Sequence, residues 1–188
     1  MQVTGRELIT AVHGMLFGGL FLMACFGALV LLLRSLAART TPDAGAAEQR
    51  WDRVYLIVMV VLGWAAVLSG TYVIYPWYRA AAPSGAANLA FYPQRLLLSS
   101  PQTAGWHELG MEWKEHIGWM APMLMTMVAW VLTKYRGAVE EHRRLRALVT
   151  AFALAAFLAA GVAGGFGAFL NKKAPVQGGR LITLRSGQ

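Results

Sequence analysis

Two histidines lie at the start of long apolar segments, where an imidazole can do chemistry that a surface histidine rarely does. His13 stands near the beginning of the first apolar segment, and His116 directly precedes the segment that begins at Ile117. Polar side chains at such depth in a membrane are rare and mark functional sites by default. Neutral imidazole is a good axial ligand for haem iron, and facing bundle helices often hold a cofactor between them. The pair therefore predicts a b-type haem (haem b) between two helices.

Small and acidic residues next to the two histidines extend this candidate site. Gly14 and Gly18 flank His13 and would let a flat cofactor approach the backbone closely. Glu112 lies one helical turn before His116, where a carboxylate can tune the ligand and handle protons. The expected cofactor-binding residues are therefore His13, His116, Gly14, Gly18 and Glu112, and no catalytic residue is predicted.

A column of methionines shares one helical face with His116. At about 100° per residue, Met120, Met123 and Met127 fall within an arc of roughly 60° that includes His116. Imidazole and thioether ligands suit copper, so a copper site using Met120 and Met123 is an alternative. Methionine also fills irregular gaps in packed cores, which leaves a polar cluster without any cofactor equally open. His107 points nearly opposite to His116 and is expected on the outer surface.

Four apolar segments must position these residues. The chain is 57% hydrophobic and only 14% charged, whereas soluble domains have about 25% charged residues. The segments cover about residues 8–33, 54–75, 108–133 and 145–170, each long enough to cross a bilayer. A bilayer forces them to be helical, because other open structures leave backbone groups unpaired in lipid. The sequence predicts an all-α integral membrane four-helix bundle forming a single domain over residues 1–188.

The longest connection, residues 76–105, joins the second and third segments. It contains four prolines and shows no long helical pattern, so a long loop is expected there. Four arginines follow the first segment and only Arg6 precedes it. By the positive-inside rule, both termini and this loop lie outside the cytoplasm. The first apolar segment is too long for a signal peptide and is expected to remain as a span.

The net charge of +8 does not indicate a nucleic-acid partner. The basic residues lie beside the apolar segments, where they would meet anionic lipid head groups, and no basic patch is interleaved with aromatic residues. Membrane lipid is therefore an expected partner. Other membrane subunits and a quinone are expected as well.

The overall pattern is similar to small bacterial four-helix membrane cytochromes and anchor subunits, at the level of architecture alone. This resemblance and the two histidines favour a haem-binding, quinone-facing electron-transfer subunit of a respiratory-type complex in the bacterial inner membrane. One alternative is a cofactor-free structural or assembly subunit that docks partners through the glycines of the fourth segment, such as Gly161 and Gly165. The other alternative is a copper-handling membrane protein.

Overall fold

Four long helical rods form the molecule, and all four are long and apolar enough to cross a membrane. The computed structural model describes residues 2–37 and 46–183. The four rods cover Gly5–Ala37, Gln49–Tyr78, Pro101–Lys134 and Arg143–Lys173. They confirm the prediction of four apolar helices and suggest a multi-pass membrane protein. Below, they are called the first to fourth spans.

Three of the spans are assembled from shorter helical pieces. The first consists of α1 (Gly5–Ala11), a π-helical segment (Val12–Gly19) and α2 (Leu20–Ala37). The second consists of α3 (Ala46–Ser69), a π-helical segment (Gly70–Ile74) and α4 (Tyr75–Tyr78). The third consists of α6 (Pro101–Glu115), a 3₁₀ turn (Ile117–Trp119) and α7 (Met120–Lys134). The fourth is the single helix α9 (Arg143–Lys173).

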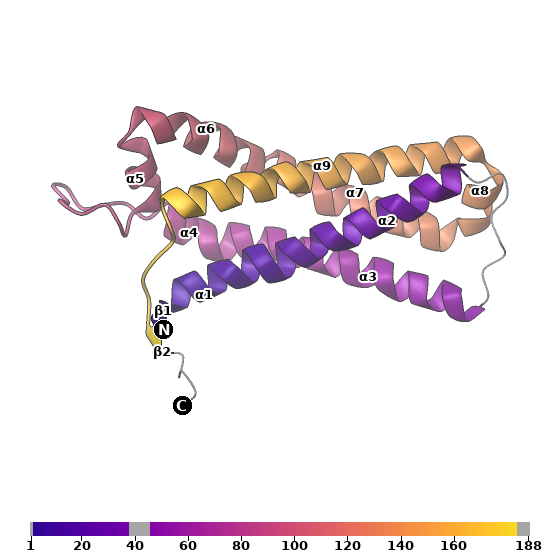
Figure 1. Cartoon of the computed structure of the whole chain (residues 1–188), viewed down its shortest axis with the longest axis horizontal. Coiled ribbons are helices and arrows are strands. Elements are labelled where there is room, and N and C mark those ends of the chain that lie inside the picture. Colours follow the sequence, from indigo (N-terminus) through magenta and orange to yellow (C-terminus); the bar gives the residue numbers. More distant parts are fainter. Residues whose placement is uncertain (1, 38–45, 184–188) are drawn as a thin grey trace.

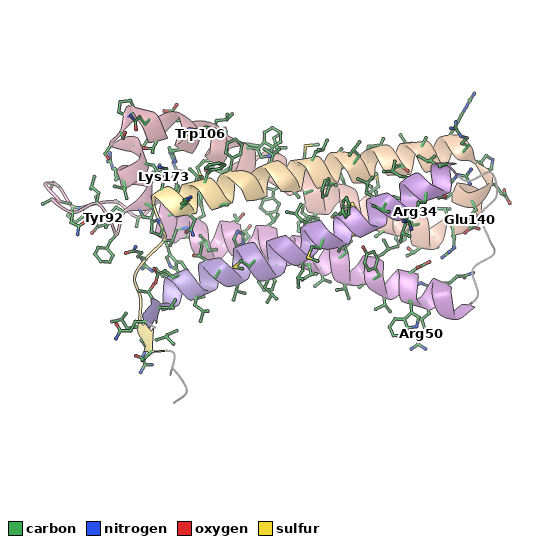
Figure 2. The ribbon with its side chains drawn as sticks, viewed as in Figure 1. Arg34, Arg50, Tyr92, Trp106, Glu140 and Lys173 are labelled. Carbon is green, nitrogen blue, oxygen red and sulfur yellow. The ribbon has the colours of Figure 1, made fainter. Side chains whose placement is uncertain are left out.

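The two ends of the bundle differ in what they carry. One end, here called the terminal end, carries the strands β1 (Gln2–Thr4) and β2 (Leu181–Thr183), α4, α5 (Pro93–Leu98) and the start of α6 (Figure 1). The end of α2, the start of α3 and α8 (Arg136–Glu141) lie at the other, here called the distal end (Figure 1). Trp106 and Tyr92 mark the terminal end, and Arg34, Arg50 and Glu140 mark the distal end (Figure 2).

The core lies between α2, α3, α7 and α9. Cys25, Met59, Met125 and Val128 are fully enclosed there, and Ala153 of α9 faces them. Small side chains let helices approach closely, which matters in lipid because apolar burial drives helix association only weakly there. The large apolar residues left exposed along the rods are the surface that lipid tails would cover.

The segment 76–105 is more helical than expected, and this part of the prediction is corrected. Pro93 begins α5, and Pro101 begins α6 with Ser100 as its cap, whose hydroxyl accepts from the Gln102 amide at 3.4 Å. Proline is favoured at the first helical position because its missing N–H is not needed there. These two prolines therefore start helices, and the third helix begins at residue 101 instead of 108.

The third span bends out of α-helical geometry at His116, which has φ −115° and ψ −61°. Proline at position 122 explains the break. Its ring nitrogen has no hydrogen to donate to the Gly118 carbonyl, and its ring would clash with that carbonyl in a regular helix. The 3₁₀ turn Ile117–Trp119 therefore separates α6 from α7 and lets α6 take its own direction.

A short antiparallel sheet, unexpected in an all-α chain, joins the two ends of the sequence. Strand β1 (Gln2–Thr4) pairs with β2 (Leu181–Thr183), with Val3 opposite Ile182. Gly178 and Gly179 precede β2 with φ of 106° and 84°, a region that favours glycine. The guanidinium of Arg6, at the start of α1, lies 5.3 Å from the centre of the Trp77 ring, so the start of the first span contacts the end of the second.

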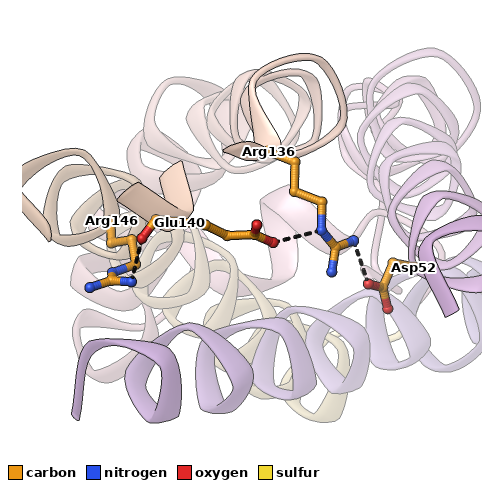
Figure 3. A network of polar contacts seen from close by, with 4 residues as sticks. All are labelled: Asp52, Arg136, Glu140 and Arg146. Atoms are coloured by element: carbon orange, nitrogen blue, oxygen red, sulfur yellow. Dashed lines mark hydrogen bonds and ion pairs between the residues drawn. The ribbon is translucent and has the colours of Figure 1, made fainter. Parts of the chain in front are cut away.

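A polar network at the distal end links α3 to α8 (Figure 3). Arg136 donates to Asp52 of α3 at 2.9 Å and to Glu140 of α8 at 2.8 Å. Arg146 donates to the Glu140 carbonyl at 2.9 Å. Partial burial lowers the pKa of Arg136, but the hydrogen bonds to Asp52 and Glu140 outweigh it, so this pKa lies above its usual value.

Candidate functional site

His13 lies in the π-helical part of the first span and faces the second span. Its Nδ1 is 3.0 Å from Ser69 Oγ, and the Ser69 hydroxyl donates to the Ala66 carbonyl at 3.2 Å. When the Ser69 hydroxyl gives its one proton to Ala66, Nδ1 of His13 is the donor in its own bond. Nε2 then carries the lone pair, ready to accept a hydrogen bond or bind a metal.

A glycine allows the His13 ring to lie this close to the second span. A Cβ atom at Gly70 would lie 2.8 Å from His13 Cε1, so any larger residue would displace the ring. Gly70 also begins the second π-helical segment of the molecule, and His13 belongs to the first. Segments of π-helix are rare and frequently lie at functional sites. Here two of them meet at one histidine.

Lys114 of α6 brings a positive charge to the same region. Its Nζ lies 3.4 Å from the place where a Cβ would stand on Gly167 of α9, so the absence of a side chain there makes room for it. The side chain is half-buried, and its charge acts on His13. Among the described residues, Lys114 makes neither a hydrogen bond nor an ion pair. Charged groups in membrane spans are normally paired, so this ammonium calls for a partner.

These residues form what we call the inner polar site. It comprises His13 and Ser69 with its neighbour Gly70, together with Lys114 and Gly167. The site offers one hydrogen-bond acceptor, His13 Nε2, and one cationic donor, the Lys114 ammonium. The sequence pointed to His13, but nothing in it indicated that Ser69 or Gly70 would be the neighbours.

His116 and Glu112 have a different environment. The His116 ring is near both the carbonyl of Glu112, at 3.1 Å, and the Glu112 carboxylate, at 3.3 Å. Their side chains are 68% and 74% exposed, so the pair lies on the surface of α6. His13 is held by the second span, whereas the partners of His116 belong to its own helix. The structure does not bring the two rings together through any contact, and the haem between them stays a prediction.

The other predicted site residues differ from His13 in their surroundings. A Cβ at Gly14 would meet nothing within 4 Å, and one at Gly18 would meet only the His13 carbonyl, at 3.4 Å. Met120 and Met123 are 42% and 48% exposed, so the methionine column faces outward. Among residues 2–37 and 46–183, no group of three His, Cys, Asp or Glu side chains is placed to hold a metal ion. The copper alternative therefore gains no support.

His107 is buried, contrary to the expectation that it belongs to the outer surface. Only 8% of it is exposed, and its Nδ1 is hydrogen-bonded to the hydroxyl of Tyr78. The two rings lie 5.7 Å apart. The helix α6 packs against α9 and the end of the second span. The spacing of residues along one helix does not predict which of its faces will be covered by another helix. The aromatic residues where the second span ends, Tyr78 among them, are the signal in the sequence that could have indicated this contact.

A cleft of about 140 Å³ opens beside this pair at the terminal end. We call it the acidic cleft because three glutamates line it. Its lining residues are Tyr78, Arg79, Gln94, His107, Glu108, Met111, Glu112 and Glu115.

Comparison with protein-family models, with curated proteins and with solved structures gave no match.

Proposed function

We propose that this chain is a quinone-facing subunit of an electron-transfer complex in the bacterial inner membrane, with both termini outside the cytoplasm. The inner polar site would receive the head group of the quinone. The single observation that supports this is the hydrogen bond between His13 and Ser69, which makes His13 Nε2 available as an acceptor in the region where the charge of Lys114 acts.

The two groups of the site match the two redox forms of a quinone. A quinone carbonyl oxygen accepts hydrogen bonds, and the Lys114 ammonium is a donor. A hydroquinone hydroxyl donates, and His13 Nε2 accepts. Oxidation of a hydroquinone breaks two O–H bonds and releases two electrons and two protons. His13 Nε2 would accept one proton and water would accept the other, while an electron acceptor in the partner complex would take the two electrons in two one-electron steps.

The haem expected between His13 and His116 stays a prediction. The Nε2 lone pair of His13, with Nδ1 held by Ser69, is the arrangement that orients an axial imidazole. His116, two-thirds exposed and bonded to Glu112, lacks a comparable arrangement. The residues therefore fit one axial ligand, and no step is assigned to a haem.

Quinone binding tests the proposal directly. Purified protein in detergent is titrated with decyl-ubiquinone, and binding is followed by quenching of tryptophan fluorescence. We expect His13→Gln and Lys114→Met each to weaken binding by about tenfold or more, because each removes a hydrogen bond to the head group. Lys114→Arg, which keeps the charge, should retain most of the affinity.

Lys134→Met is the matched control. Lys134 ends the same span at the distal end, where its Nζ lies 5.8 Å from the centre of the Trp130 ring. Unchanged affinity in both Lys114→Met and His13→Gln would contradict the proposal. An optical spectrum of the oxidised and dithionite-reduced protein tests the haem separately. If a haem is present, His13→Ala should abolish its spectrum.

A further inference from the structure

The N-terminus of α9, at the distal end, has backbone donors without acceptors in the helix (Figure 1). The amide of Arg146 donates to the His142 carbonyl at 3.1 Å, so the amides of residues 143–145 precede the first helical hydrogen bond. His142 stands at the cap position, but its Nδ1 lies 3.0 Å from the Ala138 carbonyl of α8, and its side chain caps no amide. The start of this 31-residue helix therefore offers N–H groups and the positive end of a helix dipole to an anion.

Three arginines add positive charge to this N-terminus. The first four residues of α9 include Arg143, Arg144 and Arg146, and its first turn contains no acidic residue. Basic side chains are unfavourable at this end of a helix, because the dipole already makes it positive. An anion bound there would interact favourably with the dipole and would also reduce the repulsion between the arginines.

Arg146 gives an independent indication of a ligand. It is only 9% exposed, on the face of α9 where Val149, Thr150 and Ala153 are also buried. Its Nη1 donates to the Glu140 carbonyl at 2.9 Å. Within the part of the chain that the structure describes, its Nε is the one buried side-chain nitrogen or oxygen without a hydrogen-bond partner. A buried N–H without an acceptor is costly, so a ligand that brings an acceptor to Nε would be stabilised.

The guanidinium of Arg146 is directed at the N-terminus of its own helix. It reaches back to Glu140, which lies in α8 before α9 begins (Figure 3). The Glu140 carboxylate accepts from Arg136 at 2.8 Å and is turned toward that residue (Figure 3). Nη1 is the nitrogen bound to the carbonyl, so the edge formed by Nε and Nη2 remains for a ligand. Such an edge binds two oxygen atoms of a phosphate or carboxylate at once.

The N-terminus of α9 also lies where lipid head groups would be. Trp130 and Tyr135, at the end of the preceding span, are 59% and 51% exposed. Exposed aromatic residues near the end of a span are typical of the boundary between lipid tails and head groups. The short helix α8 joins this end of the third span to α9, which brings the first turn of α9 to the same end of the bundle (Figure 1).

From these observations we propose that the N-terminus of α9 binds a phosphate group. Its oxygen atoms would accept from the amides of residues 143–145 and from Nε and Nη2 of Arg146. Nε is enclosed in the ligand-free protein, so the guanidinium would turn its free edge outward, and side-chain movements of this size are common on binding. The phosphate belongs either to the head group of an anionic lipid, such as phosphatidylglycerol, or to a soluble phosphate ester.

The test measures lipid binding to the detergent-purified protein by native mass spectrometry. Phosphatidylglycerol should bind more tightly than phosphatidylcholine with the same acyl chains, because the choline cation would be repelled by the arginines. Arg146→Lys keeps the charge and loses the planar fork, so its affinity for phosphatidylglycerol should fall about tenfold. Arg95→Lys is the matched control, since it makes the same change at an exposed arginine of α5 at the terminal end and should have no effect.

A second variant tests the backbone amides and does not depend on replacing a buried residue. In His142→Asp, the new carboxylate would accept hydrogen bonds from the amides of the first turn. The unfolding temperature should rise because the helix gains a cap, and the affinity for phosphatidylglycerol should fall about tenfold because the carboxylate occupies the place of the phosphate. His142→Ala provides no cap and should leave the affinity unchanged.

The source of the phosphate is decided by adding glycerol 3-phosphate in place of lipid. If it raises the unfolding temperature of the wild type and not that of Arg146→Lys, the site is supported and its ligand is soluble. If phosphatidylglycerol alone binds, the site is supported and its ligand is the lipid. Equal affinity for the two lipids with no response to glycerol 3-phosphate would overturn the proposal. An unchanged affinity for the bound phosphate in either Arg146→Lys or His142→Asp would overturn it as well.

Discussion

At the scale of single residues, the inner polar site depends on where side chains are missing. His13 reaches Ser69 because position 70 is glycine, and Lys114 Nζ lies against α9 because position 167 is glycine. Gly161 and Gly165 of the same helix α9 contrast with these, since a Cβ there would meet nothing within 4 Å. Glycine therefore has a packing role at the site and no such role on the open face of α9.

We expect Gly70→Ala to destabilise the protein by about 1–3 kcal/mol, because the added methyl group overpacks the contact with His13. The His13 ring would have to move, so quinone affinity should fall in the same variant. Thermal or denaturant unfolding in detergent, together with quinone titration, measures both effects. Gly161→Ala is the control and should leave stability unchanged or slightly raised, since alanine favours the helix. Equal stability of Gly70→Ala and Gly161→Ala would show that the contact with His13 is not tight.

At the scale of elements, departures from regular α-helix decide how the site is assembled. Pro122 breaks the third span at His116, and α6 can then pack against α9 and the end of the second span independently of α7. That freedom buries His107 against Tyr78. At the distal end, Arg136 ties the short helix α8 to α3 through Asp52, so the turn between the third and fourth spans is fixed by polar contacts.

Replacing Arg136 with methionine should have only a modest effect on stability. Its two ion pairs are partly exposed, with side chains of Arg136, Asp52 and Glu140 33%, 46% and 38% accessible. Water screens such pairs, so the expected loss is within about 1 kcal/mol and should shrink further at high salt. Unfolding measured at low and high salt checks this, with the exposed Arg143→Met as control. A loss of several kcal/mol that salt does not reduce would contradict it.

At the scale of the whole molecule, the two ends of the bundle face different environments if the four rods span a bilayer. The terminal end carries the acidic cleft, the small sheet and the segment between α4 and α6 (Figure 1). The distal end carries Arg34 and Arg50 along with the Arg136 network (Figure 2). Arginine and lysine near the ends of spans favour the cytoplasmic side, so we expect the distal end to lie on that side.

Cysteine labelling tests this orientation. In a Cys25→Ala background, Ser84→Cys lies at the terminal end and Glu141→Cys at the distal end. A membrane-impermeant maleimide added to intact cells should label position 84 and should label position 141 only after the membrane is opened. Labelling of position 141 alone in intact cells would mean that the orientation is reversed, and labelling of both would mean that the rods do not span the membrane as proposed.

The sequence by itself determined the four apolar helices, because the length and hydrophobicity of a span are properties of a contiguous segment. It also singled out His13, since a polar residue in an apolar run is visible without any structure. Only the tertiary structure decided which side chains meet. Ser69 and Gly70 lie more than fifty positions from His13, and the burial of His107 depends on how α6 packs after the break at His116. Contacts between spans depend on the rotation and tilt of whole helices, which local spacing does not encode.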